Sequence, residues 1–172
     1  MKILHILLPL LFSSVFLSAQ DSSSQPVDRT GKWIIEVGNG ILTNIGGSPT
    51  GASVIFADGG TISNVAFNGG RFVSDNFAYK LNLGLFSFSS GFGGNSVINV
   101  MAGGKYYFGG IAPLDITAGV ITGSGDTAFS GKATIGYAIA LADNINLEPA
   151  AGVLFADDAG NGLFQVSFAL FF

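Results

Sequence analysis

The end of the chain alternates between large apolar and smaller or polar side chains. From Phe164 to Phe172 every second residue is large and apolar. A period of two predicts a β-strand, because successive strand side chains point to opposite faces. The eleven residues 162–172, tilted by about 45°, rise roughly 26 Å, close to the ~25 Å apolar band that a transmembrane strand crosses. We therefore predict a membrane strand that presents its apolar face to lipid.

The same alternation recurs upstream and predicts an all-β fold. The expected strands are 33–43, 62–73, 77–88, 96–108, 113–122, 131–142, 144–154 and 162–172. The segment 53–56 extends the first hairpin toward a turn at 58–60. After residue 30 no run approaches the eighteen apolar residues of a membrane helix, so a membrane form has to be a closed barrel. The fold class is an eight-stranded antiparallel up-and-down transmembrane β-barrel.

Turn residues alternate between two kinds of connection. Tight turns are expected at Asp75-Asn76, Gly109-Gly110 and Asp143-Asn144. Longer loops rich in Gly, Ser, Asn and Asp are expected at 89–95, 123–130 and 155–161. Short turns at one end and longer loops at the other are typical of outer-membrane barrels. Pro149 falls inside the seventh strand, where it cannot donate to the ladder, and predicts a bulge or local break in that strand.

Six charged residues fall on the inward face of the predicted strands. They are Glu36, Lys80, Lys105, Asp115, Lys132 and Glu148. Three of them lie five positions after a tight-turn residue, which puts them at one depth. Buried charges persist only when paired, and three acids with three bases allow complete pairing. We predict an ion-pair network that fills the lumen and fixes strand register; the alternative is a polar conduit or small-ligand site.

The N-terminus predicts export. Lys2 precedes the apolar run Ile3 to Leu17 and the small-residue ending Leu17-Ser18-Ala19, as in a secretory signal that is cleaved after Ala19. We assign 1–19 to the signal peptide, 20–31 to a flexible lead-in and 32–172 to the barrel. Removal of the signal also removes His5, the one histidine of the chain.

Composition narrows the chemistry. Charged residues are 10% of the sequence and apolar residues 48%, whereas a soluble domain has about 25% charged residues. Without Cys and His the mature chain has neither a Ser-His pair nor a His-ligated metal, so we expect no enzyme, cofactor or metal site. The loop acids Asp157 and Asp158 are more simply solvated than bound to a cation. An acidic balance of 7 basic to 11 acidic residues disfavours nucleic acid as a partner.

Two other functional classes stay open. With the barrel inverted, apolar side chains inward, the chain would be a soluble secreted or periplasmic ligand-binding barrel of lipocalin type. An enzyme acting on lipid or glycan would need acidic or hydroxyl side chains around an open cavity. Aromatic residues clustered near the turn end favour the membrane, because they form an interfacial girdle there. They are Trp33, Phe77, Tyr79, Tyr106, Phe108 and Phe172.

Segment 32–172 resembles the small outer membrane β-barrel proteins of the OmpA/OmpX type, in the versions common in Bacteroidetes-like bacteria. The motifs that carry the resemblance are GRFVSDNFAYKLNLGL, AGGKYYFGG, YAIALADNINLEPAAG and the terminal FQVSFALFF. The resemblance implies location in the outer membrane with its lipid as partner, and often no enzymatic role. It also implies that the insertion machinery reads Phe168, Leu170 and Phe172 as a C-terminal signal. We expect a structural or surface-interaction barrel with a side-chain-filled lumen.

Overall fold

Antiparallel strands make up nearly all of the structure, a computed structural model that describes residues 28–39, 50–57, 60–90, 93–123, 125–156 and 159–172. The predicted signal peptide lies outside these residues. The strands are β1 (Trp33–Asn39), β2 (Gly51–Ala57), β3 (Gly60–Phe72), β4 (Phe77–Ser90), β5 (Gly93–Phe108), β6 (Ala112–Gly123), β7 (Asp126–Gly136), β8 (Ile139–Ala142), β9 (Ile145–Ala156) and β10 (Ala159–Phe171). Within the described ranges, no helix has the length and apolar character to cross a membrane.

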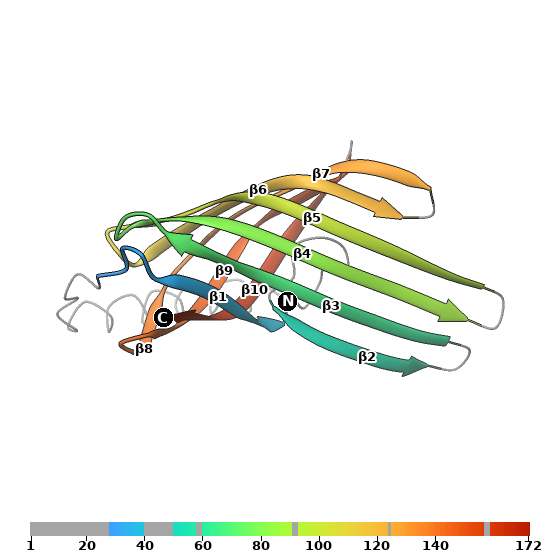
Figure 1. Cartoon of the computed structure of the whole chain (residues 1–172), viewed down its shortest axis with the longest axis horizontal. Helices are drawn as coiled ribbons and strands as arrows, with labels where there is room; N and C mark the ends of the chain where they lie inside the picture. Colours follow the sequence, from blue (N-terminus) through green and yellow to red (C-terminus); the bar gives the residue numbers. More distant parts are fainter. Residues whose placement is uncertain (1–27, 40–49, 58–59, 91–92, 124, 157–158) are drawn as a thin grey trace, which may run out of the picture.

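The ten strands form a closed eight-stranded barrel because two barrel strands are each built from two pieces (Figure 1). β1 and β2 follow one another along the same edge of β3, and β7 and β8 follow one another along β9. The predicted all-β barrel fold is thereby confirmed. The last four residues of the expected first strand, 40–43, lie outside the described residues.

Closure joins the first strand to the last. β1 pairs with β10 from Ile34↔Phe171 to Asn39↔Val166, and on its other side β1 pairs with β3. At the end of the seam, the backbone N–H of Trp33 donates to the carbonyl of Phe172 over 2.7 Å, and the N–H of Phe172 donates to the carbonyl of Trp33 over 3.1 Å. The C-terminal stretch therefore closes the barrel.

The break that we predicted at Pro149 occurs in the neighbouring strand rather than in the strand that contains the proline. β9 runs without a break through Pro149, and the interruption lies in the neighbouring strand, between Gly136 and Ile139. Gly136 pairs with Ala150, and the ladder resumes in the same register at Ile139, so residue 137 lies opposite the proline. The N–H of Tyr137 still donates to the carbonyl of Pro149 over 3.0 Å, but proline has no N–H to return the bond, and the regular strand breaks on the partner side.

Three of the predicted loops are shorter than expected. Strand pairing continues to Ser90↔Gly93, to Gly123↔Asp126 and to Ala156↔Ala159. The segments rich in Gly, Ser and Asn thus extend the hairpins beyond the apolar part of the strands. Composition had marked them as loops, but an antiparallel hairpin satisfies its own backbone groups and needs no apolar side chain to continue.

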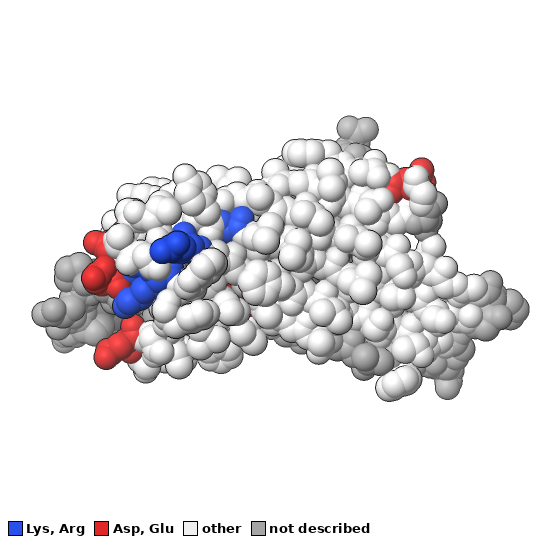
Figure 2. Space-filling view, in the orientation of Figure 1, with Lys and Arg blue, Asp and Glu red and all other residues white. Residues whose placement is uncertain are grey.

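Large apolar side chains face outward along the whole barrel. Leu81, Ile135 and Phe168 are exposed, whereas Lys80, Lys132 and Glu148 are buried, which is the predicted direction of alternation. The space-filling view shows no charged residue over the middle of this face, and Lys and Arg lie toward the turn end only (Figure 2). Five of the six predicted girdle aromatics are exposed near that end: Trp33, Tyr79, Tyr106, Phe108 and Phe172.

Close strand approach explains two of the inward glycines. A Cβ atom on Gly103 would lie 2.0 Å from the carbonyl oxygen of Ile116, and one on Gly119 would lie 2.0 Å from that of Val100. Real Cβ atoms do not approach backbone so closely. Strongly coiled strands, rather than lumen volume alone, therefore require glycine at these two positions.

Candidate functional site: the charged lumen

All six predicted charged residues lie inside the barrel. Each residue is at most 3% exposed, and together they come from β1, β4, β5, β6, β7 and β9. The alternation that faces their neighbours to the exterior turns these side chains inward, and the short turns bring their strands to a common depth. The structure therefore brings together all the charged residues that the sequence placed in the lumen.

The six side chains form one continuous chain of alternating charge. Lys105 lies between Glu36 and Glu148 and bonds to both. The ammonium of Lys80 is 2.5 Å from a carboxylate oxygen of Glu36 and 3.8 Å from one of Asp115. Lys132 completes the chain, 3.5 Å from Asp115. The order is Glu148, Lys105, Glu36, Lys80, Asp115, Lys132.

Tyr107 links this chain to an aromatic floor at the turn end. Its hydroxyl donates to Glu148 over 2.8 Å, and its ring centroid lies 5.8 Å from that of Phe72. Phe72 is in turn 5.8 Å from Phe171. All three rings are buried, and with Ile34 and small alanines they form the apolar core of the described barrel. The floor separates the ion pairs from the turn end.

Arg29 covers the floor from outside, although it belongs to the predicted flexible lead-in. Its guanidinium carbon lies 4.4 Å from the ring centroid of Tyr107 and 5.3 Å from that of Phe171. The guanidinium also donates to the carbonyl oxygen of Gly110 over 3.1 Å. Sequence reasoning missed this residue. The available signal was an inward-facing tyrosine next to a turn, which offers a π-face to a cation.

Asp75 anchors the same segment at the β3–β4 turn. Its carboxylate accepts hydrogen bonds from the Thr30 hydroxyl over 2.7 Å and from the backbone N–H groups of Thr30 and Arg29 over 3.3 Å each. These bonds, the Thr30 hydroxyl first, hold the pKa of Asp75 below its ordinary value of 3.8, because they favour the charged form.

A second group of buried polar residues lies next to the ion pairs, on the side away from the β3–β4 turn. The side-chain amides of Asn68 and Asn82 and the hydroxyl of Ser130 are buried, yet bond to no other described residue. Asn68 and Asn82 are direct partners across β3 and β4. Buried polar groups are nearly always hydrogen-bonded, so we expect these side chains to bind internal water.

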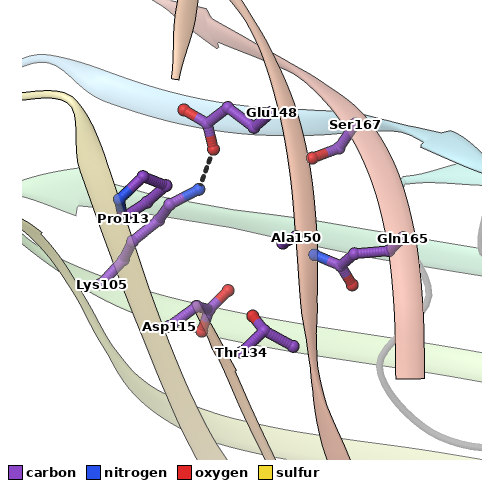
Figure 3. Close-up of a pocket in the computed structure, with 8 residues that line it drawn as sticks. All are labelled: Lys105, Pro113, Asp115, Thr134, Glu148, Ala150, Gln165 and Ser167. Carbon is purple, nitrogen blue, oxygen red and sulfur yellow. Dashed lines mark hydrogen bonds and ion pairs between the residues drawn. The ribbon is translucent and has the colours of Figure 1, made fainter. Parts of the chain in front are cut away.

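A small cavity adjoins the ion pairs. It is lined by Lys105, Pro113, Asp115, Thr134, Glu148, Ala150, Gln165 and Ser167. Figure 3 shows these side chains converging from β5, β6, β7, β9 and β10. Its volume, counted as space for the centres of water molecules, is about 10 Å³. That is room for about one water molecule and excludes a substrate-sized ligand from this cavity.

The predicted C-terminal signal residues lie on the outer side of the closing seam. Phe168 and Phe172 are exposed, and Leu170 is half-buried. Their recognition by insertion machinery stays a prediction. In the described part of the chain no group of three His, Cys, Asp or Glu could hold a metal ion. Asp157 and Asp158 lie outside the described residues.

Comparison with known proteins supports the architecture. No protein family model matches the sequence, and a search of curated proteins finds no match. Among solved structures, the barrel is similar to the Yersinia pestis outer membrane protein Ail in a phospholipid bilayer nanodisc, with a TM-score of 0.50. The match covers 83% of this chain and 99% of Ail at 13% sequence identity, so the likeness is one of fold. The chain thus shares its eight-stranded architecture with an outer membrane β-barrel protein.

Proposed function

We propose that the chain is an integral outer-membrane β-barrel protein with a structural or surface-interaction role and no enzymatic activity. The observation that carries this proposal is the direction of the side chains, with large apolar groups outside and ions inside. In water this exterior would be a large contiguous apolar patch, which monomeric soluble proteins rarely expose. In a bilayer the same apolar surface would contact the hydrocarbon chains of the lipid.

The lumen supports a filled barrel rather than a ligand-binding barrel. A lipocalin-type carrier needs an apolar cavity, whereas the interior holds six paired ions, buried amides and a cavity of about one water. The aromatic floor and Arg29 cover the turn end of this lumen. We infer that the barrel passes no steady ion current, and that its interior fixes strand register.

Export and assembly form the remaining part of the proposal. The segment 1–19 directs secretion, and the insertion machinery reads Phe168, Leu170 and Phe172 on the strand that closes the barrel. Outer-membrane barrels extend further on the extracellular side than on the periplasmic side. The hairpins opposite the β3–β4 and β5–β6 turns continue beyond the apolar part of the strands, so we assign the turn end to the periplasm. Surface partners would then meet the opposite end.

Fractionation of cells that express the full chain tests the location. We expect the protein in the outer-membrane fraction, extracted by detergent only, with slower gel migration after heating as the barrel unfolds. Recovery in the soluble periplasm would refute a membrane barrel and support the carrier alternative.

Planar-bilayer recording tests the filled lumen. The purified protein is expected to give no stepwise conductance, with a known open porin as the positive control. A matched variant is Arg29→Ala, which uncovers the floor but leaves the six ions in place and should also remain closed. Steady conductance of the wild-type protein would refute the filled lumen while leaving the membrane location intact.

A further inference from the structure

Two basic residues of the barrel take no part in the ion pairs of the lumen or in the contacts of the floor. Of the seven Lys and Arg, Lys2 falls in the predicted signal, three lysines pair inside the lumen, and Arg29 covers the floor. The remaining two are Lys32 and Arg71. Among the described residues, no carboxylate lies within ion-pair distance of either.

Arg71 stands in a row of three outward side chains that crosses three strands. In the sheet register Arg71 of β3 lies directly opposite Trp33 of β1 on one side and Tyr79 of β4 on the other. All three side chains are exposed, Trp33 by 52% and Tyr79 by 62%. We call these three residues the Trp-Arg-Tyr row. The strand register thus places a cation between two exposed aromatic residues on the exterior.

The guanidinium of Arg71 is positioned but not saturated. Its carbon lies 5.7 Å from the Trp33 ring, and its Nε donates to the carbonyl oxygen of Gly31 over 3.4 Å. Among the described residues, none accepts a hydrogen bond from the two terminal amino groups. They form the half of the guanidinium that can grip two oxygens of one phosphate.

The position of the row along the barrel axis indicates which kind of phosphate it would meet. Trp and Tyr side chains favour the headgroup level of a membrane, and the Lys and Arg of Figure 2 lie where the uncharged middle of the exterior ends. Basic side chains at this level attract anionic lipid headgroups. We propose that the Trp-Arg-Tyr row binds the phosphate of an anionic phospholipid in the membrane leaflet on the turn side. This inference rests on the proposed membrane location.

Trp33 makes the site directly observable, because it is the one tryptophan in the chain. The full chain is inserted into phosphatidylcholine vesicles that contain an equal mole fraction of either brominated phosphatidylglycerol or brominated phosphatidylcholine. Bromine quenches tryptophan fluorescence at contact. We expect brominated phosphatidylglycerol to occupy the site about fivefold more strongly, the ratio that corresponds to about 1 kcal/mol for one basic side chain near an anionic surface.

Two matched variants separate a built site from overall charge. Arg71→Gln is expected to abolish the preference, whereas Lys32→Gln, which removes the same charge beside the row, is expected to keep most of it. Equal loss in both variants would assign the preference to general attraction and overturn the proposal. Both variants keep the barrel if the unheated proteins migrate faster than the heated ones, as expected for the wild-type protein.

The remaining outcomes are also decisive. Equal quenching of the wild-type protein by the two brominated lipids would overturn the lipid site and leave the membrane location standing. Absence of quenching by either lipid would instead refute insertion itself. Inorganic phosphate at matched ionic strength is expected to leave the preference unchanged; its loss would assign the site to free phosphate and overturn the proposal.

Discussion

Replacement of Lys105 by methionine tests whether the lumen is held by its ion pairs. The Lys105 ammonium lies between the carboxylates of Glu36 and Glu148, and all three side chains are at most 4% exposed. Methionine keeps most of the length of the lysine stem and removes the charge. Glu36 would retain Lys80 at 2.5 Å, but Glu148 would retain only the hydroxyl of Tyr107 at 2.8 Å.

The expected loss of stability comes from leaving the carboxylate of Glu148 without an ionic partner. Removal of one partner from a buried pair costs about 3–5 kcal/mol, because the remaining charge is desolvated without compensation. The hydrogen bond from Tyr107 is worth about 1.5–3 kcal/mol, but it is present in both proteins and cancels. We expect the free energy of unfolding of Lys105→Met to fall by about 3–5 kcal/mol. The double variant Lys105→Met/Glu148→Gln restores equal numbers of acids and bases and should recover more than half of this loss.

Denaturant unfolding in detergent micelles or vesicles, followed by Trp33 fluorescence, measures these differences. Lys32→Met makes the same chemical change at a lysine that has no ionic partner among the described residues, and should cost less than about 1 kcal/mol. A Lys105→Met loss no larger than that of Lys32→Met would refute the ion-pair account. A double variant as unstable as the single one would show that lost packing, rather than unpaired charge, is the cause.

Three further changes probe the floor, the sheet and the turn. Arg29→Ala should cost about 1–3 kcal/mol in denaturant unfolding, through lost stacking and hydrogen bonds over the aromatic floor, and Arg29→Lys should cost less. Gly119→Ala should cost about 1–3 kcal/mol because its Cβ meets the backbone of Val100, whereas Gly160→Ala, with nothing within 4 Å, should be nearly neutral; an equal effect would refute the close approach. The hydrogen bonds that lower the pKa of Asp75 contribute stability above its ordinary value of 3.8, and this stability is lost as the pH falls through the lower folded value. Asp75→Asn should therefore weaken the acid dependence of the melting temperature, and an unchanged profile would contradict this.

The face of the barrel on which each charged residue lies, and its distance from the turn end, could be predicted from the sequence. Both depend only on residues nearby in the chain. A period of two decides which way each strand residue points, so Lys80 and Leu81 had to face opposite sides. A fixed offset from a tight turn decides depth, which brought Asp115 and Glu148 to the level of Lys80. The neutral count of inward charges then predicted pairing.

The sequence could not show which lysine pairs with which carboxylate, because this depends on the tilt of the strands and on the length of the side chains. Nothing local indicates that Lys105 bridges Glu36 and Glu148 rather than Asp115. The position of Arg29 is set by the floor it covers, which exists only after three distant strands meet. For Pro149 the physics was right and the strand wrong, because a missing donor disturbs the partner that would have accepted its bond.

Glu36 lies on the strand that seals the cylinder, and it provides the link between Lys80 and Lys105. In a sheet whose two edges have not met, β1 would pair with β3 alone and Glu148 of β9 would lie at the far edge, away from Lys105. Correct union of the N-terminal and C-terminal edges therefore also completes the chain of ion pairs. The ion pairs thus favour the correct seam, since a misaligned seam would move Glu36 away from Lys80 and Lys105.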